Sequence, residues 1–214
     1  MGDIHNYFED QEKELKYWLC LSLARIVNKR FYAEIDFFQK NSADYCFLRG
    51  FYHRNAMEYS QAEDFFNRAL EKSPHLQRAK REKVTVLLAQ KKYEEALELA
   101  EENYEKNPEN SYQIYGYFRC LVRKKNLGTN DVKILENLMN AMKENLSDKR
   151  EELYAAMEIE FQDYAHHLPP TKLLTIINEA EKKYPNSLDV RRAAQTFKLR
   201  QSIISKEEDI PEEC

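Results

Sequence analysis

A motif that occurs twice, 34 residues apart, constrains this chain more than any other feature. Each copy places aromatic, small and proline residues at matching positions. The first copy comprises Tyr59, Ala62, Phe66, Ala69, Leu70 and Pro74, and the second comprises Tyr93, Ala96, Ala100, Asn103, Tyr104 and Pro108. Repetition with a period of about 20 to 50 residues is typical of chains that stack small units side by side, instead of folding around one core.

Within each copy the apolar positions follow the spacing of an α-helix. Small residues such as Gly50 and Ala62 leave room for a neighbouring helix, while the large ring of Phe66 fills the space between helices. Pro74 and Pro108 are expected to end the second helix of each copy, because a proline pushes the residue before it out of the α region. Each copy therefore predicts two helices joined by a turn.

This pattern resembles the tetratricopeptide repeat (TPR), a helix-turn-helix unit of the same length with a small residue, a tyrosine, alanines, an aromatic residue and a terminal proline at these spacings. The resemblance implies an all-α fold, a right-handed α-solenoid of stacked antiparallel helix pairs, with clear repeats at 43–76 and 77–110. The second repeat departs from the pattern. Lys83 stands at a position that is usually apolar, and Ala100 replaces the large aromatic residue.

Outside the two clear repeats, weaker helical patterns predict divergent pairs. Ala180 and Ile177 precede Pro185 at the spacing at which Ala69 and Phe66 precede Pro74. The expected segments are an N-terminal extension at 1–8, a repeat domain at 9–204 with divergent pairs at 9–41, 111–146 and 148–184 and a capping helix at 187–203, and an acidic disordered tail at 205–214.

The helix expected at 9–27 is rich in apolar residues, which are Leu15, Trp18, Leu19, Leu21, Leu23 and Ile26. Their number predicts that most of one side of this helix is buried. The ends of a solenoid are open, so a homo-oligomer could also form there. The residues that could form such a contact are Tyr17, Trp18, Phe31, Phe37, Phe197 and Leu199, for which packing in the core is the competing interpretation.

Composition and charge exclude several classes of protein. Only 4 glycines and 6 prolines occur in 214 residues, which argues against β-sandwiches and against nucleotide-binding folds with glycine-rich phosphate loops. The net charge of −4 equals the charge of residues 206–213, so the remainder of the chain is neutral. Domains that bind nucleic acid are usually strongly basic, so the charge also disfavours that class.

The sequence contains neither a membrane-spanning apolar run nor a signal peptide, so we expect a cytoplasmic protein. Cys20, Cys46 and Cys120 are widely spaced and are expected to be small buried side chains. Asp163 and His167 share one helix face, but helix-end histidines of this kind are more often exposed than bound to metal. We therefore predict no catalytic residues, no metal and no cofactor.

In TPR proteins the first helices of successive pairs line a concave groove. Carried onto this sequence, the groove positions hold mostly arginines and aromatic residues, which are common at binding hot spots. The candidate residues are Phe47, Phe51, Arg54, Arg78, Arg81, Thr85, Tyr112, Tyr115, Arg119 and Arg123. They indicate a protein-interaction or scaffold module that binds a partner segment of acidic or aromatic character. The competing interpretation is that they are ordinary packing and solvated residues.

Three other functions compete with this interpretation. The carboxylate clamp of chaperone adaptors is disfavoured, because Phe47 and Phe51 stand where the clamp has lysine and asparagine. The groove could instead bind RNA or another polyanion by stacking and charge neutralisation. A weaker resemblance, carried by 79–82 and 103–105, is to helical repeats at the C-terminal ends of large bacterial NTPases. It implies a sensor or regulatory segment of a larger assembly.

Overall fold

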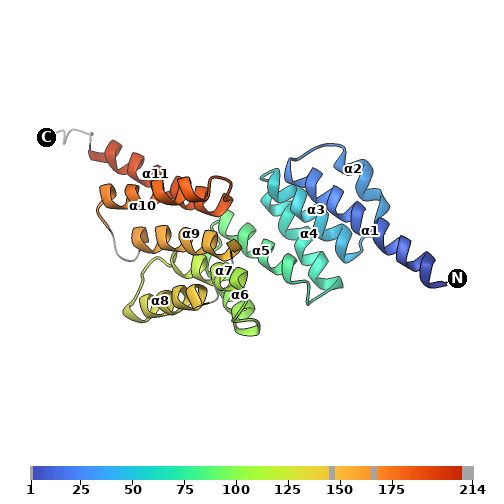
Figure 1. The fold of residues 1–214 in the computed structure, drawn as a ribbon, viewed down its shortest axis with the longest axis horizontal. Helices are drawn as coiled ribbons and strands as arrows, with labels where there is room; N and C mark the ends of the chain where they lie inside the picture. The colour runs from blue at the N-terminus through green and yellow to red at the C-terminus, as the bar shows by residue number, and fades with distance from the viewer. Residues whose placement is uncertain (1, 145–147, 165–167, 209–214) are drawn as a thin grey trace. The chain divides into compact units, whose positions relative to one another are not determined.

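The computed structural model describes residues 2–144, 148–164 and 168–208, and every regular element in these ranges is a helix (Figure 1). The elements are α1 (Gly2–Arg25), α2 (Phe31–Glu34), the 3-10 helix η1 (Ile35–Phe37), α3 (Ala43–Asn55), α4 (Tyr59–Lys72), α5 (Gln77–Ala89), α6 (Tyr93–Lys106), α7 (Ser111–Leu121), α8 (Thr129–Glu144), α9 (Asp148–Tyr164), α10 (Pro170–Lys183) and α11 (Leu188–Glu208). They form two compact units, unit 1 (residues 1–99) and unit 2 (residues 100–214), with the boundary inside α6.

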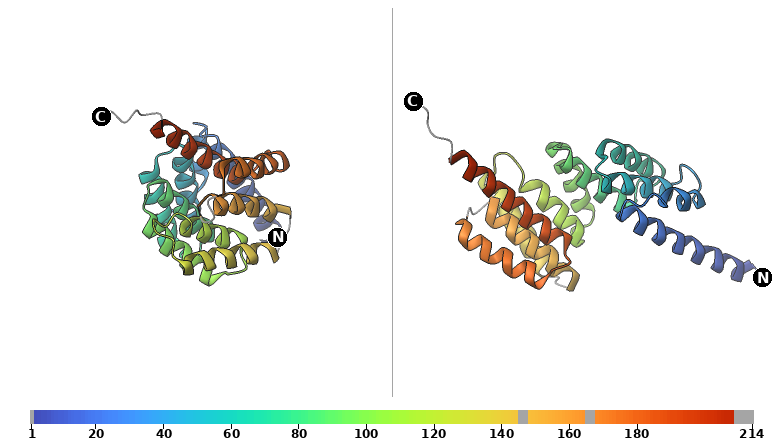
Figure 2. Two further views of the ribbon diagram at one scale, coloured as in Figure 1. Left: turned by 90° about the vertical axis from the view of Figure 1, so that its left-hand side faces the viewer. Right: turned by 90° about the horizontal axis from the view of Figure 1, so that it is seen from above.

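Helices that are neighbours in the sequence pack together in both units. In unit 1, α3 packs against α4, and α4 against α5. In unit 2, α8 contacts α7 and α9, and α10 contacts α9 and α11. Figure 2 shows these consecutive helices side by side in two further views. The predicted all-α fold of consecutive TPR-like helix pairs is confirmed.

The turn inside each clear repeat has the same backbone structure. After α3 the chain reverses at Met57, which has a φ of 62°, and the next amide donates to the carbonyl oxygen of His53 at 2.9 Å. After α5, Lys91 also has a φ of 62°, and the next amide donates to the carbonyl oxygen of Leu87 at 3.0 Å. This bond from beyond the helix end to its last turn is the Schellman motif. The 34-residue period of the sequence is therefore also a period of the backbone.

The second helices end where the prolines predict. The helices α4, α6 and α10 each stop two residues before a proline, which is Pro74, Pro108 and Pro185 respectively. A proline fixes its own φ and disfavours the α region for the residue that precedes it. The match at Pro185 supports the interpretation of α9 and α10 as a divergent repeat.

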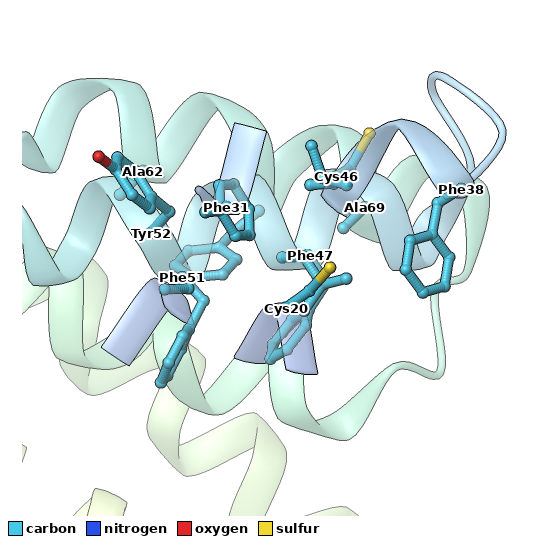
Figure 3. Close-up of a cluster of buried hydrophobic side chains, with 14 of the residues drawn as sticks. Cys20, Phe31, Phe38, Cys46, Phe47, Phe51, Tyr52, Ala62 and Ala69 are labelled. Atoms are coloured by element: carbon cyan, nitrogen blue, oxygen red, sulfur yellow. The ribbon is translucent and has the colours of Figure 1, made fainter. Parts of the chain in front are cut away.

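The core of unit 1 is built from the small and aromatic residues of the repeat (Figure 3). Gly50 on α3 lies against Phe66 on α4, and a Cβ atom added at Gly50 would stand 2.7 Å from the Phe66 ring. The predicted burial of Cys20 and Cys46 is confirmed, and both thiols lie within this core.

Unit 2 is organised around α9, which contacts α7, α8, α10 and α11. The Phe161 ring on α9 lies 6.5 Å from the Phe118 ring on α7, measured between centroids. Leu135 of α8 and Phe197 of α11 are buried in the same unit. The cysteine of this unit, Cys120, is buried as predicted.

Several helix ends differ from the expected segments. The helix α1 begins at Gly2, inside the expected N-terminal extension, and α11 continues to Glu208, inside the expected tail. The remaining tail residues, 209–214, lie outside the described ranges. The second helix of the first pair is short, since α2 ends at Glu34 and a single 3-10 turn follows.

The expected burial of the N-terminal helix was wrong for one of its faces. Tyr17, Cys20 and Ala24 are buried, but Leu15, Trp18, Leu19 and Ile26 are 71%, 55%, 37% and 68% exposed. The helix carries apolar residues on two opposite faces, and α2, η1 and α3 pack on one of them only. In the part of the chain that the structure describes, no helix combines the length and the apolar character needed to cross a membrane.

Candidate functional site

The ten residues predicted to line the groove divide between the two units and are described separately. Unit 1 contains Phe47, Phe51, Arg54, Arg78, Arg81 and Thr85, and unit 2 contains Tyr112, Tyr115, Arg119 and Arg123.

In unit 1, Arg78 is held by aromatic rings that α1 and α3 contribute. Its guanidinium lies 5.0 Å from the centre of the Tyr17 ring and 5.8 Å from that of Phe47, and it donates a hydrogen bond to the Tyr17 hydroxyl. Burial raises the pKa of Tyr17, although Arg78 lowers it in part, so the hydroxyl stays neutral. The group that accepts this hydrogen bond from Arg78 is therefore uncharged, and the contact does not neutralise the positive charge of Arg78.

Arg54 and Arg81 approach the same carboxylate. Arg54 Nη1 lies 3.3 Å from Glu82 Oε2, and Arg81 Nη2 lies 3.7 Å from Glu82 Oε1. Glu82 is buried on α5. The Arg54 guanidinium also lies 4.7 Å from the centre of the Phe51 ring. Rings stack well against guanidinium planes, so the pair of contacts fixes the orientation of Arg54.

The remaining predicted residues of unit 1 have structural contacts. Phe47 and Phe51 are buried, and their rings stack with centroids 6.1 Å apart (Figure 3). The Thr85 hydroxyl donates to the carbonyl oxygen of Arg81 at 3.4 Å, on its own helix. Phe47 and Phe51 contact the guanidinium groups of Arg78 and Arg54 respectively. We call Arg54, Arg78 and Arg81 the arginine surface of unit 1.

In unit 2 the predicted residues are mostly internal. Arg123 forms a double hydrogen bond with Glu160 on α9, at 2.9 and 3.2 Å, and also donates to the carbonyl oxygen of Arg119 at 2.7 Å. Tyr115 and Arg119 are buried, and the Arg119 guanidinium lies 5.4 Å from the Tyr115 ring. Tyr115 and Arg119 therefore lie inside unit 2, and the side chain of Arg123 is 15% exposed. The physical reason is the carboxylate of Glu160, which requires a buried cation.

Burial raises the pKa of Glu160, but the positive charges of Arg123, Arg119 and Arg192 outweigh it, so the pKa is lowered. The carboxylate is therefore ionised at neutral pH and neutralises Arg123. Tyr112, the fourth predicted residue of unit 2, is 45% exposed at the start of α7.

Two residues that contact the arginine surface were not among the predicted site residues. Tyr17 was considered only for self-association, yet it holds Arg78. Glu82 is absent from the predicted set, yet two arginines approach its carboxylate. The helical spacing of Tyr17, Cys20 and Ala24 could have shown which face of α1 turns inward.

Among the described residues, no group of three or more histidine, cysteine or acidic side chains is placed to hold a metal ion. His167, which was weighed as a metal ligand, lies outside the described ranges. Burial raises the pKa of Cys20 to about 11 and that of Cys120 to about 12. Both thiols therefore remain protonated at neutral pH, where a thiol is a poor nucleophile.

Known proteins resemble this chain in fold and not in sequence. No family model matches the chain, and no curated protein matches it. A solved structure described as MamA 41-end from Desulfovibrio magneticus RS-1 has a TM-score of 0.51 and 18% identity, and covers 80% of this chain and 98% of its own. A second structure, described as a MamA RS-1 ArsTM double mutant, has a TM-score of 0.50 and 19% identity, and covers 80% of this chain and 98% of its own. MamA has a TPR-like helical fold, so these matches support the same fold here.

Proposed function

We propose that this chain is a protein-interaction module and that the arginine surface of unit 1 binds an acidic segment of a partner protein. The observation that carries the proposal is the exposed guanidinium of Arg78, whose hydrogen bond goes to the neutral Tyr17 hydroxyl. Arg54 and Arg81, which approach the Glu82 carboxylate, bring two further positive charges to the same surface. The three guanidinium groups attract anionic groups.

The chemistry of the three side chains favours carboxylates as ligands. A guanidinium binds a carboxylate through two parallel hydrogen bonds, which adds geometric specificity to charge attraction. Arg54 and Arg78 are already oriented by the rings of Phe51 and Tyr17. Because an oriented side chain has less rotational freedom to lose, binding costs less entropy than it would with free arginines. Helical repeat folds commonly present such surfaces to extended segments.

The test is a titration with an acidic probe peptide. Fluorescein-labelled decaglutamate is followed by fluorescence anisotropy with the unaltered chain, with the Arg78→Glu/Arg81→Glu variant and with Arg81→Glu alone. We expect the double variant to bind about a hundredfold more weakly, because two charge-assisted contacts become repulsive. The single variant Arg81→Glu leaves the contact between Arg78 and Tyr17 intact, so weaker binding by this variant does not come from loss of that packing. Circular dichroism checks that helicity is retained.

The matched control is Lys72→Glu, which reverses an exposed charge at the end of α4 outside the arginine surface. This variant is expected to bind the peptide as the unaltered chain does. If the double variant binds decaglutamate with unchanged affinity, the arginine surface is not the binding site.

The alternative ligand for the same surface is RNA or another polyanion. It is less favoured, because the chain without residues 206–213 has no net positive charge. A labelled oligouridylate in the same titration separates the two. Tighter binding of the oligouridylate than of the peptide, falling steeply as salt is added, identifies a nucleic-acid surface instead. If the chain is instead a regulatory segment of an NTPase-type assembly, the arginine surface is still the surface that contacts the partner.

A further inference from the structure

Residues 206–213 of this chain, which we call the acidic segment, have the chemistry that the arginine surface of unit 1 is proposed to bind. The segment contains five acidic side chains and one lysine, while the rest of the chain has as many basic as acidic side chains. The carboxylates belong to Glu207, Glu208, Asp209, Glu212 and Glu213. The net negative charge of the chain is therefore concentrated in this one short stretch.

The acidic segment begins in the last turn of α11, which ends at Glu208. The carboxyl end of a helix carries a partial negative charge, so basic side chains stabilise this end and carboxylates destabilise it. Glu207 and Glu208 are thus unfavourably placed for α11 itself. A cationic surface that approaches this end of the helix relieves the repulsion, and the carboxylates of the segment gain partners.

The arginine surface presents guanidinium groups that are already oriented. Arg78 is exposed, and it lies 5.0 Å from the centre of the Tyr17 ring, whose neutral hydroxyl accepts its hydrogen bond. The guanidinium of Arg54 lies 4.7 Å from the centre of the Phe51 ring. Each guanidinium can take a carboxylate through two parallel hydrogen bonds. The segment and the surface are therefore complementary in charge and in the geometry of their groups.

The place of the segment in unit 2 favours a contact between two copies of the chain. The helix α11 packs against α9 and α10, which fixes the start of the segment within unit 2. Residues 209–213 extend beyond the helix, and an extended chain of that length spans about 18 Å at most. The segment can therefore reach a surface only close to the end of α11. A second copy can bring its arginine surface to that place by diffusion.

We propose that the acidic segment of one copy binds the arginine surface of a second copy. This rests on the function proposed above for the arginine surface, and it names another molecule of this chain as the partner. The two contacting regions are different, so the contact is heterologous, and each copy can both donate a segment and receive one. Copies therefore associate head to tail. Because the paired charges are exposed, added salt weakens the association.

Two variants of the full chain separate the segment from the surface. The neutral-segment variant replaces the five carboxylates by amides, as Glu207→Gln, Glu208→Gln, Asp209→Asn, Glu212→Gln and Glu213→Gln. The surface variant is Arg78→Glu/Arg81→Glu. By sedimentation equilibrium in about 20 mM salt, each variant alone is expected to associate about tenfold more weakly than the unaltered chain. Circular dichroism verifies that both variants remain helical.

An equal mixture of the two variants tests the head-to-tail arrangement. The surface variant keeps an intact acidic segment, and the neutral-segment variant keeps an intact arginine surface. The mixture is therefore expected to form a dimer that neither variant forms alone. It should not grow beyond a dimer, because the remaining segment and the remaining surface are both altered.

A labelled peptide measures the same contact directly. A fluorescein-labelled peptide with the sequence of residues 205–213 is titrated with the neutral-segment variant, in which no intact segment competes, and binding is followed by fluorescence anisotropy. The peptide is expected to bind, and to bind about tenfold more weakly when Arg81→Glu is added to this variant. The control peptide carries amides in place of the five carboxylates and is expected not to bind.

The proposal is overturned if the unaltered chain is a monomer at about 300 µM in low salt. If in that case the labelled peptide binds the neutral-segment variant more tightly than the unaltered chain, the segment occupies the arginine surface of its own copy. The proposal is also overturned if the mixture of variants associates no more strongly than either alone. Binding of decaglutamate without binding of the segment peptide rejects the segment as ligand and leaves the proposed function in place, whereas failure of both peptides rejects the two proposals together.

Discussion

At the scale of single residues, the helical glycines Gly50 and Gly116 have opposite surroundings. Gly50 lies at the crossing of α3 and α4, where an added Cβ would stand 2.7 and 2.8 Å from two atoms of the Phe66 ring. The ring is itself fully buried. Gly116 lies in α7, and an added Cβ there would meet no atom within 4 Å. One glycine is required by packing and the other is not.

Alanine substitutions at these two positions should therefore change stability in opposite directions. Gly50→Ala is expected to lower the free energy of unfolding by about 1 to 3 kcal/mol, because overpacking outweighs the gain in helix propensity. Gly116→Ala is expected to raise it by about 0.5 to 1 kcal/mol, since only the propensity changes. Urea denaturation followed by circular dichroism measures both. Equal effects at the two sites would contradict the close approach at Gly50.

At the scale of helices, an internal ion pair joins α7 to α9. Arg123 follows the last turn of α7, and Glu160 is 2% exposed on α9, with a shortest N–O distance of 2.9 Å. Such a pair is weak evidence of net stabilisation, but removing one partner leaves the other charge buried and uncompensated. The arginine was predicted to face a ligand, because its partner lies 37 residues away in the sequence and no local pattern reveals it.

Replacing Glu160 tests this internal role. Glu160→Gln is expected to lower the free energy of unfolding by about 3 kcal/mol at neutral pH, because Arg123 loses its counter-charge. The double variant Arg123→Met/Glu160→Met removes both charges, and should be less destabilised than the single one. Urea denaturation of the three proteins provides the comparison. If Glu160→Gln is as stable as the unaltered chain, then Arg123 does not depend on this carboxylate.

The same pair predicts how stability depends on pH. The pKa of Glu160 is lower in the folded chain than its ordinary value of 4.5, because of the neighbouring arginines and in spite of burial. The stabilisation from its charge is therefore complete above pH 4.5 and is lost as the pH falls through the folded-state pKa. We expect the unaltered chain to lose more stability than Glu160→Gln over this acid range. Parallel pH profiles that differ only by a constant would contradict the assignment.

At the scale of the whole molecule, much of the fold could be predicted from signals that lie close together in the sequence. The prolines at 74, 108 and 185 marked the ends of three helices, and the repeat of 34 residues appears again in the turns at Met57 and Lys91. Each of these signals acts within a few residues of the chain. For that reason they can be read from the sequence without knowledge of distant contacts.

The candidate site was predicted only in part, because exposure depends on contacts between distant segments. Groove positions carried over from TPR proteins included Arg54, Arg78 and Arg81, of which Arg78 is exposed and the other two are half-buried. They also included Arg119, which is buried. The error at Trp18 is the reverse, since a residue expected in the core is 55% exposed. It was interpreted mainly as a core residue, because helical spacing identifies an apolar face but does not show whether another element covers it.

The central claim, that the arginine surface of unit 1 binds acidic protein segments, can be tested directly by NMR of the arginine side chains. The guanidinium Nε–H resonances are assigned and followed while unlabelled decaglutamate is added to the ¹⁵N-labelled chain. The account predicts shifts that saturate together at Arg54, Arg78 and Arg81, while those of the internal Arg119 and Arg123 stay in place. Saturable shifts confined to unit 2, or no saturable shift at the three arginines, would contradict it.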